Sequence, residues 1–225
     1  MKTKNSTVSV SPRLCRSLAS SLAIVCLIGF CSLQARADTI ALSFAPGGPN
    51  FNTGVGTDTL GWAFALSAPT TITQLGVWDN GADGLIQQHK VTIWDSTGTI
   101  IEAQATVPSG TAAPLTNGFR YVTLGSSVLL APGSYTIGAF FDAFGDEAAS
   151  QASAITTNSP VGYLGSRAIA GDAFPPTDAF GLPNSYFGPN FQFASPVAAP
   201  DSGSTISLLG FAFLGLVGLR RKLGF

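Results

Sequence analysis

Short stretches in which large apolar residues alternate with small or polar ones are the feature that most constrains this fold. In residues 60–66 every second side chain is large and apolar: Leu60, Trp62, Phe64 and Leu66. The same period of two recurs in residues 101–107 and 135–141. Successive side chains of a strand point to opposite faces of a sheet. The pattern therefore predicts β-strands that bury one face, with Trp62 in the core.

Further strands are predicted at residues 39–44, 71–78, 90–95, 119–124 and 186–193, separated by Gly- and Asp-rich turns. Residues 38–196 contain no long stretch with the 3.6-residue period of a helix. Many short strands at this spacing favour an all-β fold, a β-sandwich of the jelly-roll type. Residues 142–185 interrupt the pattern, because they are rich in Ala, Ser, Gly and Pro. We expect a long excursion there with one short strand at 161–164.

Residues 1–37 have the composition of a secretory signal peptide. They contain five basic residues and no acidic one, and an apolar stretch is strongest at 22–30. Small residues at Ala35 and Ala37 occupy the positions that a signal peptidase requires, so cleavage is expected before Asp38. The segment predicts a signal helix and transport through the secretion translocon.

Cysteine usage limits the chemistry of the remaining chain. All three cysteines, Cys15, Cys26 and Cys31, lie within residues 1–37. Residues 38–196 can therefore form no disulfide and no thiolate metal site, and they contain no cysteine nucleophile. At 159 residues, this segment is long enough for one domain with a sizeable core of its own.

The charge of residues 38–196 differs from that of the whole chain. Three basic residues stand against eleven acidic ones in this segment, a net charge of about −8. An acidic surface argues against nucleic acid and against anionic lipid as partners. It suits a soluble exported protein or one that binds cations.

Residues 197–225 have three parts: a polar segment, an apolar run and a basic cluster. The run Ile206–Leu219 has 14 uncharged residues, about 21 Å as a helix, against about 30 Å for a bilayer core. We therefore expect a short transmembrane helix at 206–225 that is not a secure permanent anchor, preceded by a linker and motif at 197–205. The motif consists of Pro200, Asp201, Ser202, Gly203, Ser204 and Thr205. The basic stop consists of Arg220, Arg221 and Lys222, and it should lie on the cytoplasmic side of the membrane.

This tail resembles the PEP-CTERM class of sorting signals, in the variant with the motif Val-Pro-Asp-Ser-Gly-Ser-Thr. Ala199 replaces the usual Val. The resemblance implies recognition by an exosortase, a membrane-embedded cysteine transpeptidase, while the precursor is in the inner membrane. It further implies delivery to the cell surface or extracellular space. An ordinary tail anchor is the alternative, but it does not explain the Pro-Asp-Ser-Gly-Ser-Thr string.

A second resemblance covers roughly half of the predicted domain. It rests on the strings Leu60-Gly-Trp-Ala-Phe, Leu75-Gly-Val-Trp-Asp, His89-Lys-Val-Thr-Ile-Trp-Asp and Leu130-Ala-Pro-Gly-Ser-Tyr. These are similar to an exported bacterial β-sandwich domain of unknown function, often found beside such sorting tails. The resemblance supports the fold and brings no catalytic residues with it.

The domain shows little sign of catalysis. His89 is the only histidine, and no Gly-x-Ser-x-Gly elbow is present. We expect no enzyme activity, and His89 should make a hydrogen bond at the edge of a loop.

We expect the domain to bind no cofactor, and a calcium site is the alternative. Asp79, Asn80 and Asp83 share one turn, and Asp142, Asp146 and Glu147 share another. Calcium prefers oxygen ligands from such loops. The simpler interpretation, which we favour, is that these are ordinary solvated turn residues.

Two tryptophans bear on the remaining function classes. Trp78 and Trp94 lie opposite the expected core residues of their strands, so they could stack on sugar rings or be covered by residues 142–185; we favour the covered arrangement. The sequence thus predicts a structural or adhesive exported protein. A carbohydrate-binding module acting in exopolysaccharide is the alternative.

Overall fold

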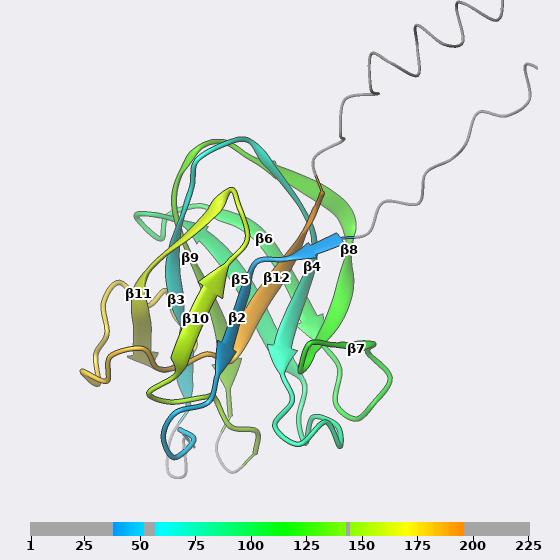
Figure 1. Ribbon diagram of the computed structural model, residues 1–225, viewed down its shortest axis with the longest axis vertical. Coiled ribbons are helices and arrows are strands. Elements are labelled where there is room, and N and C mark those ends of the chain that lie inside the picture. Colours follow the sequence, from blue (N-terminus) through cyan, green and yellow to red (C-terminus); the bar gives the residue numbers. More distant parts are fainter. Residues whose placement is uncertain (1–37, 52–56, 143–144, 196–225) are drawn as a thin grey trace, which may run out of the picture. The chain divides into compact units, whose positions relative to one another are not determined.

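The computed structural model describes residues 38–51, 57–142 and 145–195, which form an all-β domain without a helix (Figure 1). Its strands are β1 (Asp38–Ile40), β2 (Leu42–Ala45), β3 (Asp58–Leu66), β4 (Thr70–Trp78), β5 (His89–Asp95), β6 (Ile101–Val107), β7 (Leu115–Thr116), β8 (Phe119–Leu130), β9 (Gly133–Phe141), β10 (Ser153–Thr157), β11 (Val161–Ala170) and β12 (Pro189–Ala194).

Two five-stranded antiparallel sheets make up most of the domain. The first has the order β1-β12-β4-β8-β7, and the second has the order β11-β3-β9-β5-β6. A two-stranded ribbon of β2 and β10 lies between the β11 side of one sheet and the β12 side of the other (Figure 1). The sheets pack as in a sandwich, which confirms the predicted all-β class. The jelly-roll type stays a prediction.

Aromatic side chains from both sheets form the centre of the core. Trp62 of β3 is fully buried and stacks on Phe191 of β12, with ring centroids 5.9 Å apart. Its Nε1 donates a hydrogen bond to the Pro189 carbonyl oxygen at 2.9 Å. Phe64 packs against the same Phe191 ring at 4.8 Å. The prediction that Trp62 is a core residue is confirmed.

The alternating patterns predicted the strand faces well where the side chains are large. The inward residues of β3 and β9 are buried, and the register sets Trp62 opposite Ile137. In β6 the pattern is only partly correct, because Ile101 is 57% exposed although Ala103 and Val107 are buried. The pairing of β6 with β5 shifts by one residue between Ile93 and Trp94. Ile101 therefore does not continue the alternation of buried side chains that includes Ala103 and Val107.

The predicted excursion at 142–185 is wrong, since this segment contains β10 and the ten-residue strand β11. β11 forms an edge of the second sheet and pairs with β3 along its whole length. A bulge at Leu164 shifts the alternation, and the inward positions that follow carry Ser166 and Ala168. A strand with such small inward residues has no large apolar pattern, so it was detected only in part.

The predicted strand at 39–44 is two strands that meet at Ala41. β1 pairs with β12 in the first sheet, whereas β2 pairs with β10. Ala41 connects both partners: its amide donates to Phe191, and its carbonyl accepts from Asn158. The chain therefore passes from one sheet to the ribbon at this residue.

The predicted terminal segments fall outside the described residues. They are the signal helix at 1–37, the linker and motif at 197–205, and the hydrophobic helix at 206–225. Within the part of the chain that the structure describes, no helix is long and apolar enough to span a membrane.

Candidate functional site

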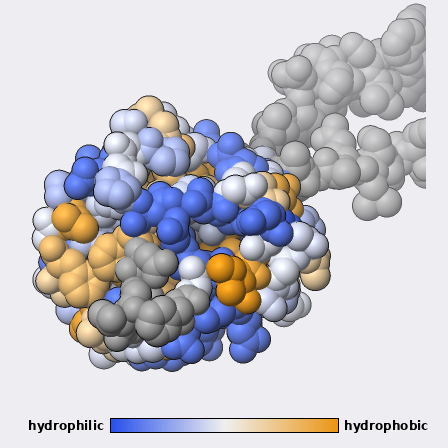
Figure 2. Space-filling view, turned by 90° about the horizontal axis from the view of Figure 1, so that it is seen from below, coloured by the Kyte–Doolittle hydropathy of each residue, from blue (hydrophilic) through white to orange (hydrophobic). Residues whose placement is uncertain are grey.

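Two polar loops meet at the lower end of the sandwich in Figure 1. One loop connects β4 to β5, and the other follows β9. Seen from below, this end carries a band of hydrophilic side chains between hydrophobic patches (Figure 2). Asp146 joins the two loops: its Oδ1 accepts the Ile86 amide at 2.9 Å, and its Oδ2 accepts the Gln87 amide at 3.0 Å.

His89, the first residue of β5, lies beneath this junction and is 1% exposed. Its Nε2 lies 2.8 Å from Asp146 Oδ2, and its Nδ1 lies 3.0 Å from the Phe140 carbonyl oxygen. Since both partners are acceptors, the ring satisfies both contacts when each nitrogen donates a proton. The predicted hydrogen bond of His89 is confirmed, although the residue is buried. Both ring nitrogens of His89 thus contact protein acceptors.

The environment of Asp146 changes its acidity. Burial alone would raise the pKa of this carboxyl group. The hydrogen bond from His89 and those from the amides of Gln87 and Ile86 outweigh burial, and the pKa of Asp146 is lower than usual. The carboxylate form of Asp146 therefore stabilises the contact between the loops.

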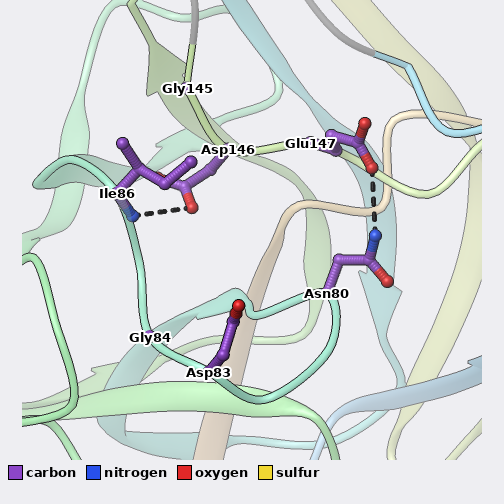
Figure 3. A pocket seen from close by; sticks show the side chains of 7 residues that line it. All are labelled: Asn80, Asp83, Gly84, Ile86, Gly145, Asp146 and Glu147. Carbon is purple, nitrogen blue, oxygen red and sulfur yellow. Dashed lines mark hydrogen bonds between the residues drawn. The ribbon is translucent and has the colours of Figure 1, made fainter.

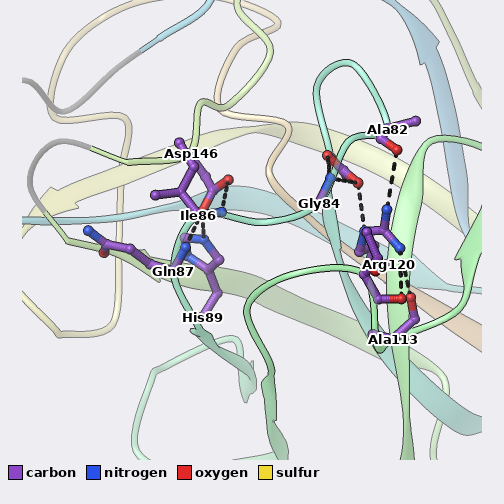
Figure 4. A network of polar contacts seen from close by, with 10 residues as sticks. Ala82, Gly84, Ile86, Gln87, His89, Ala113, Arg120 and Asp146 are labelled. Atoms are coloured by element: carbon purple, nitrogen blue, oxygen red, sulfur yellow. Dashed lines mark hydrogen bonds and ion pairs between the residues drawn. The ribbon is translucent and has the colours of Figure 1, made fainter.

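A second buried contact lies beside the first (Figure 4). Arg120 of β8 donates from Nε to Asp79 Oδ2 at 2.6 Å, and the two side chains are 5% and 2% exposed. The guanidinium group also donates to the carbonyl oxygens of Ala113 at 3.0 Å and Ala82 at 3.3 Å. Asp79 in turn accepts the Gly84 amide. Arg120 thus fixes three segments at this end of the domain.

Arg120 was not among the residues that we predicted. The available signal was a single basic residue between two aromatic ones in a predicted strand, in a domain with few basic residues. A buried charge needs a partner, and acidic turn residues were the candidates. Sequence alone does not identify which acid pairs with it.

A pocket of about 250 Å³ lies between the two loops (Figure 3). It is lined by Asn80, Asp83, Gly84, Ile86, Gly145, Asp146 and Glu147. Glu147 Oε2 already accepts hydrogen bonds from Asn80 at 3.0 Å and from Asn50 at 2.6 Å. The structure thus brings the two predicted acidic turns together, with both Asp146 oxygens and Glu147 Oε2 engaged by protein donors.

The favoured interpretation of the acidic turn residues as solvated is wrong for Asp79, which is 3% exposed. The Asp79 carboxylate is buried against Arg120 and does not face the pocket lined by Asp83. Among residues 38–51, 57–142 and 145–195, no group of three or more His, Cys, Asp or Glu side chains is arranged to hold a metal ion.

A groove of about 540 Å³ lies close to this end of the second sheet. It is lined by Gln87, Gln88, Lys90, Thr106, Phe140 and Asp142, and we call it the β5–β6 groove. Lys90 and Thr106 are paired across β5 and β6. Lys90 also forms an ion pair with Asp172. Of these residues, only Asp142 was singled out from the sequence. An aromatic residue at the outward position of a strand, Phe140, was the signal that could have indicated the groove.

Residues of the 142–185 segment cover Trp94, as we predicted. It is 8% exposed, and its ring meets Phe174 edge-on at 5.8 Å. Thr59 holds the segment that carries Phe174: its hydroxyl donates to the Gly171 carbonyl at 2.8 Å and accepts the Ala173 amide at 3.2 Å.

Trp78 is also 8% exposed, but a different segment covers it. The ring of Phe44 in β2 meets Trp78 at 5.7 Å, where we expected residues 142–185. Trp78 belongs to the first sheet and Trp94 to the second. The two rings therefore form no common platform, and neither presents an open face to a sugar ring.

The processing residues are placed only in part. Ala35, Ala37, the motif at 200–205 and the basic stop at 220–222 lie outside the described residues. Asp38, the expected N-terminus after cleavage, begins β1. Its Oδ2 accepts hydrogen bonds from Thr73 and Gln74, each at 2.9 Å.

Comparison with known proteins bears on the tail. Residues 200–223 match the family described as the VPDSG-CTERM motif. No curated protein and no solved structure gives a significant match to the chain. Residues 200–223 are thus a VPDSG-CTERM motif, a variant of the PEP-CTERM type of sorting signal.

Proposed function

We propose that this chain is an exported protein of the cell surface or extracellular matrix, in which the β-sandwich has a structural or adhesive role. The observation that carries the proposal is the VPDSG-CTERM motif at 200–223, which implies sorting by an exosortase. The composition of residues 1–37 supports export through the secretion translocon. The inner membrane then holds the precursor through residues 206–225.

The described domain supports a role without catalysis. Both ring nitrogens of His89 contact acceptors. The buried pair of Arg120 and Asp79 joins neighbouring segments. These contacts favour a rigid scaffold, which suits a load-bearing or adhesive module.

The test is fractionation of a host that carries the matching exosortase. Pro200-Asp201-Ser202-Gly203 is replaced by four alanines in one variant, and residues 206–225 are deleted in another. We expect the first variant to remain as an uncleaved membrane precursor and the second to be released without sorting. Conservative exchange of Leu208 for Ile, within the apolar run, is the matched control and should be processed normally. Equal processing of the wild type and the alanine variant would refute the sorting role.

The second candidate function is a carbohydrate-binding module acting in exopolysaccharide. The specific observation in its favour is the β5–β6 groove, which combines an aromatic ring with amide, hydroxyl and charged groups. The buried tryptophans do not support it.

A further inference from the structure

We propose that the β5–β6 groove binds a neutral saccharide chain, through Phe140, Gln88, Thr106 and Lys90. This inference deepens the adhesive role proposed above and rests on it. The groove volume of about 540 Å³ falls within the range of about 300–1,000 Å³ that is common for small-ligand sites.

The lining of the groove has the chemistry that a sugar ring requires. A sugar ring has apolar C–H faces and a rim of hydroxyl groups that both donate and accept hydrogen bonds. The phenyl ring of Phe140, on β9, is partly exposed and offers an apolar surface for such a face. Gln88 offers an amide donor and acceptor, and Thr106 offers a hydroxyl group; both residues are exposed.

The groove is held in shape before any ligand arrives. The backbone of Lys90 is held by its pairing with Thr106, and its side chain forms an exposed ion pair with Asp172. The backbone of Phe140 is fixed from below by the hydrogen bond to His89. The Gln87 amide is bonded to Asp146. A preorganised site loses little conformational entropy on binding.

The charges around the groove decide between neutral and anionic saccharides. Lys90 is its one cation, and the carboxylates of Asp142 and Asp172 lie on or beside the same groove. The domain as a whole carries eleven acidic residues against three basic ones. A chain of uronic acids would therefore meet repulsion, whereas a neutral chain would not.

The experiment measures binding of the full-length chain, purified in a mild detergent, to two sets of immobilised oligosaccharides. The neutral set holds gluco-, manno- and galacto-oligosaccharides, and the anionic set holds oligogalacturonates and oligoalginates. We expect the wild type to bind a neutral member more tightly than any anionic one. Thr106→Ala and Phe140→Leu should each weaken that binding by about tenfold, the effect of one lost favourable contact.

Matched controls separate loss of the site from loss of the fold. Thr123→Ala alters an exposed strand threonine in the first sheet, and Phe180→Leu alters an exposed phenylalanine outside the groove. Both controls should bind like the wild type. Thr106 is exposed on β6, so its substitution tests the groove even if Phe140→Leu lowers the melting temperature.

Three results would overturn the assignment: no binding to the neutral set, tighter binding to the anionic set, or unchanged binding in both groove variants. Retention on the surface of cells is measured in parallel. If the groove variants are retained normally, the proposal that the groove binds the saccharide is rejected, and the adhesive role remains. A wild type that is exported and not retained would reject the adhesive role itself.

Discussion

Arg120 and Asp79 form a buried ion pair between β8 and the loop after β4, with Nε and Oδ2 2.6 Å apart. The two residues are 41 positions apart in the sequence. The same guanidinium group donates to three backbone carbonyls, those of Thr111, Ala113 and Ala82. Each side chain therefore supplies the opposite charge that compensates the burial of the other.

Removal of one partner should be costly. Arg120→Ala leaves the Asp79 carboxylate buried without its cation, and we expect the free energy of unfolding to fall by about 3–5 kcal/mol. Urea denaturation measures the loss. Arg167→Ala, on the edge strand β11, is the control and should have a much smaller effect, because Arg167 is only partly buried. Similar losses for both variants would show that the buried pair is not special.

Acid should weaken the contact between the two loops. The folded pKa of Asp146 is below its usual value of 3.8, so the contribution of Asp146 to stability is present above about pH 4. It is lost as the pH falls through the lower, folded pKa. Asp146→Asn should therefore reduce the loss of stability on acidification. Denaturation curves recorded at several acidic pH values measure this effect. Asp83→Asn, in the exposed part of the opposite loop, is the control and should keep the pH dependence of the wild type. An unchanged pH dependence in Asp146→Asn would contradict the assignment.

The packing of the two sheets depends on Trp62. Trp62→Ala should lower the free energy of unfolding by about 3–5 kcal/mol, because it leaves a cavity against Phe191. Trp62→Phe keeps an aromatic ring and loses the hydrogen bond to Pro189, so we expect a smaller loss. A melting temperature unaffected by Trp62→Ala would mean that the side chain is not part of the core.

Phe174 should protect Trp94 from solvent. Phe174→Ala removes the ring that meets Trp94 edge-on, so acrylamide should quench the tryptophan fluorescence more strongly. In a Trp94→Phe background the same substitution should leave quenching unchanged, which assigns the effect to this tryptophan. Phe180→Ala serves as the control, since Phe180 stacks on Phe51. Equal quenching with and without Phe174 would show that other residues cover Trp94.

Signal cleavage is expected after Ala37. The new N-terminus would then be Asp38, the first residue of β1, whose partner in β12 is Ala194. N-terminal sequencing of the exported protein tests this. Ala37→Phe should accumulate the precursor, because a signal peptidase needs a small residue at this position. Arg36→Phe, at the less restrictive neighbouring position, should still be cut. An N-terminus at Met1 or within the apolar stretch at 22–30 would contradict the prediction.

The local patterns were sufficient for several features of this protein. Alternation in residues 60–66 and 135–141 predicted strands, their inward faces and the burial of Trp62, because the side-chain period of a strand is a local property. The motif at 200–223 is likewise a contiguous string, so the sequence alone revealed it. The acidic turns that contribute to the polar pocket could also be identified, since turn residues have local signatures.

Only the tertiary structure decided which distant residues meet. β11 is a strand because β3 offers it a long partner, although its inward residues Ser166 and Ala168 are small. Asp79 pairs with Arg120 across 41 positions, and Asp146 meets His89 across 57 positions. These outcomes depend on the pairing order of the strands and on the burial that the packed sheets impose, neither of which is encoded in a local period or a short motif.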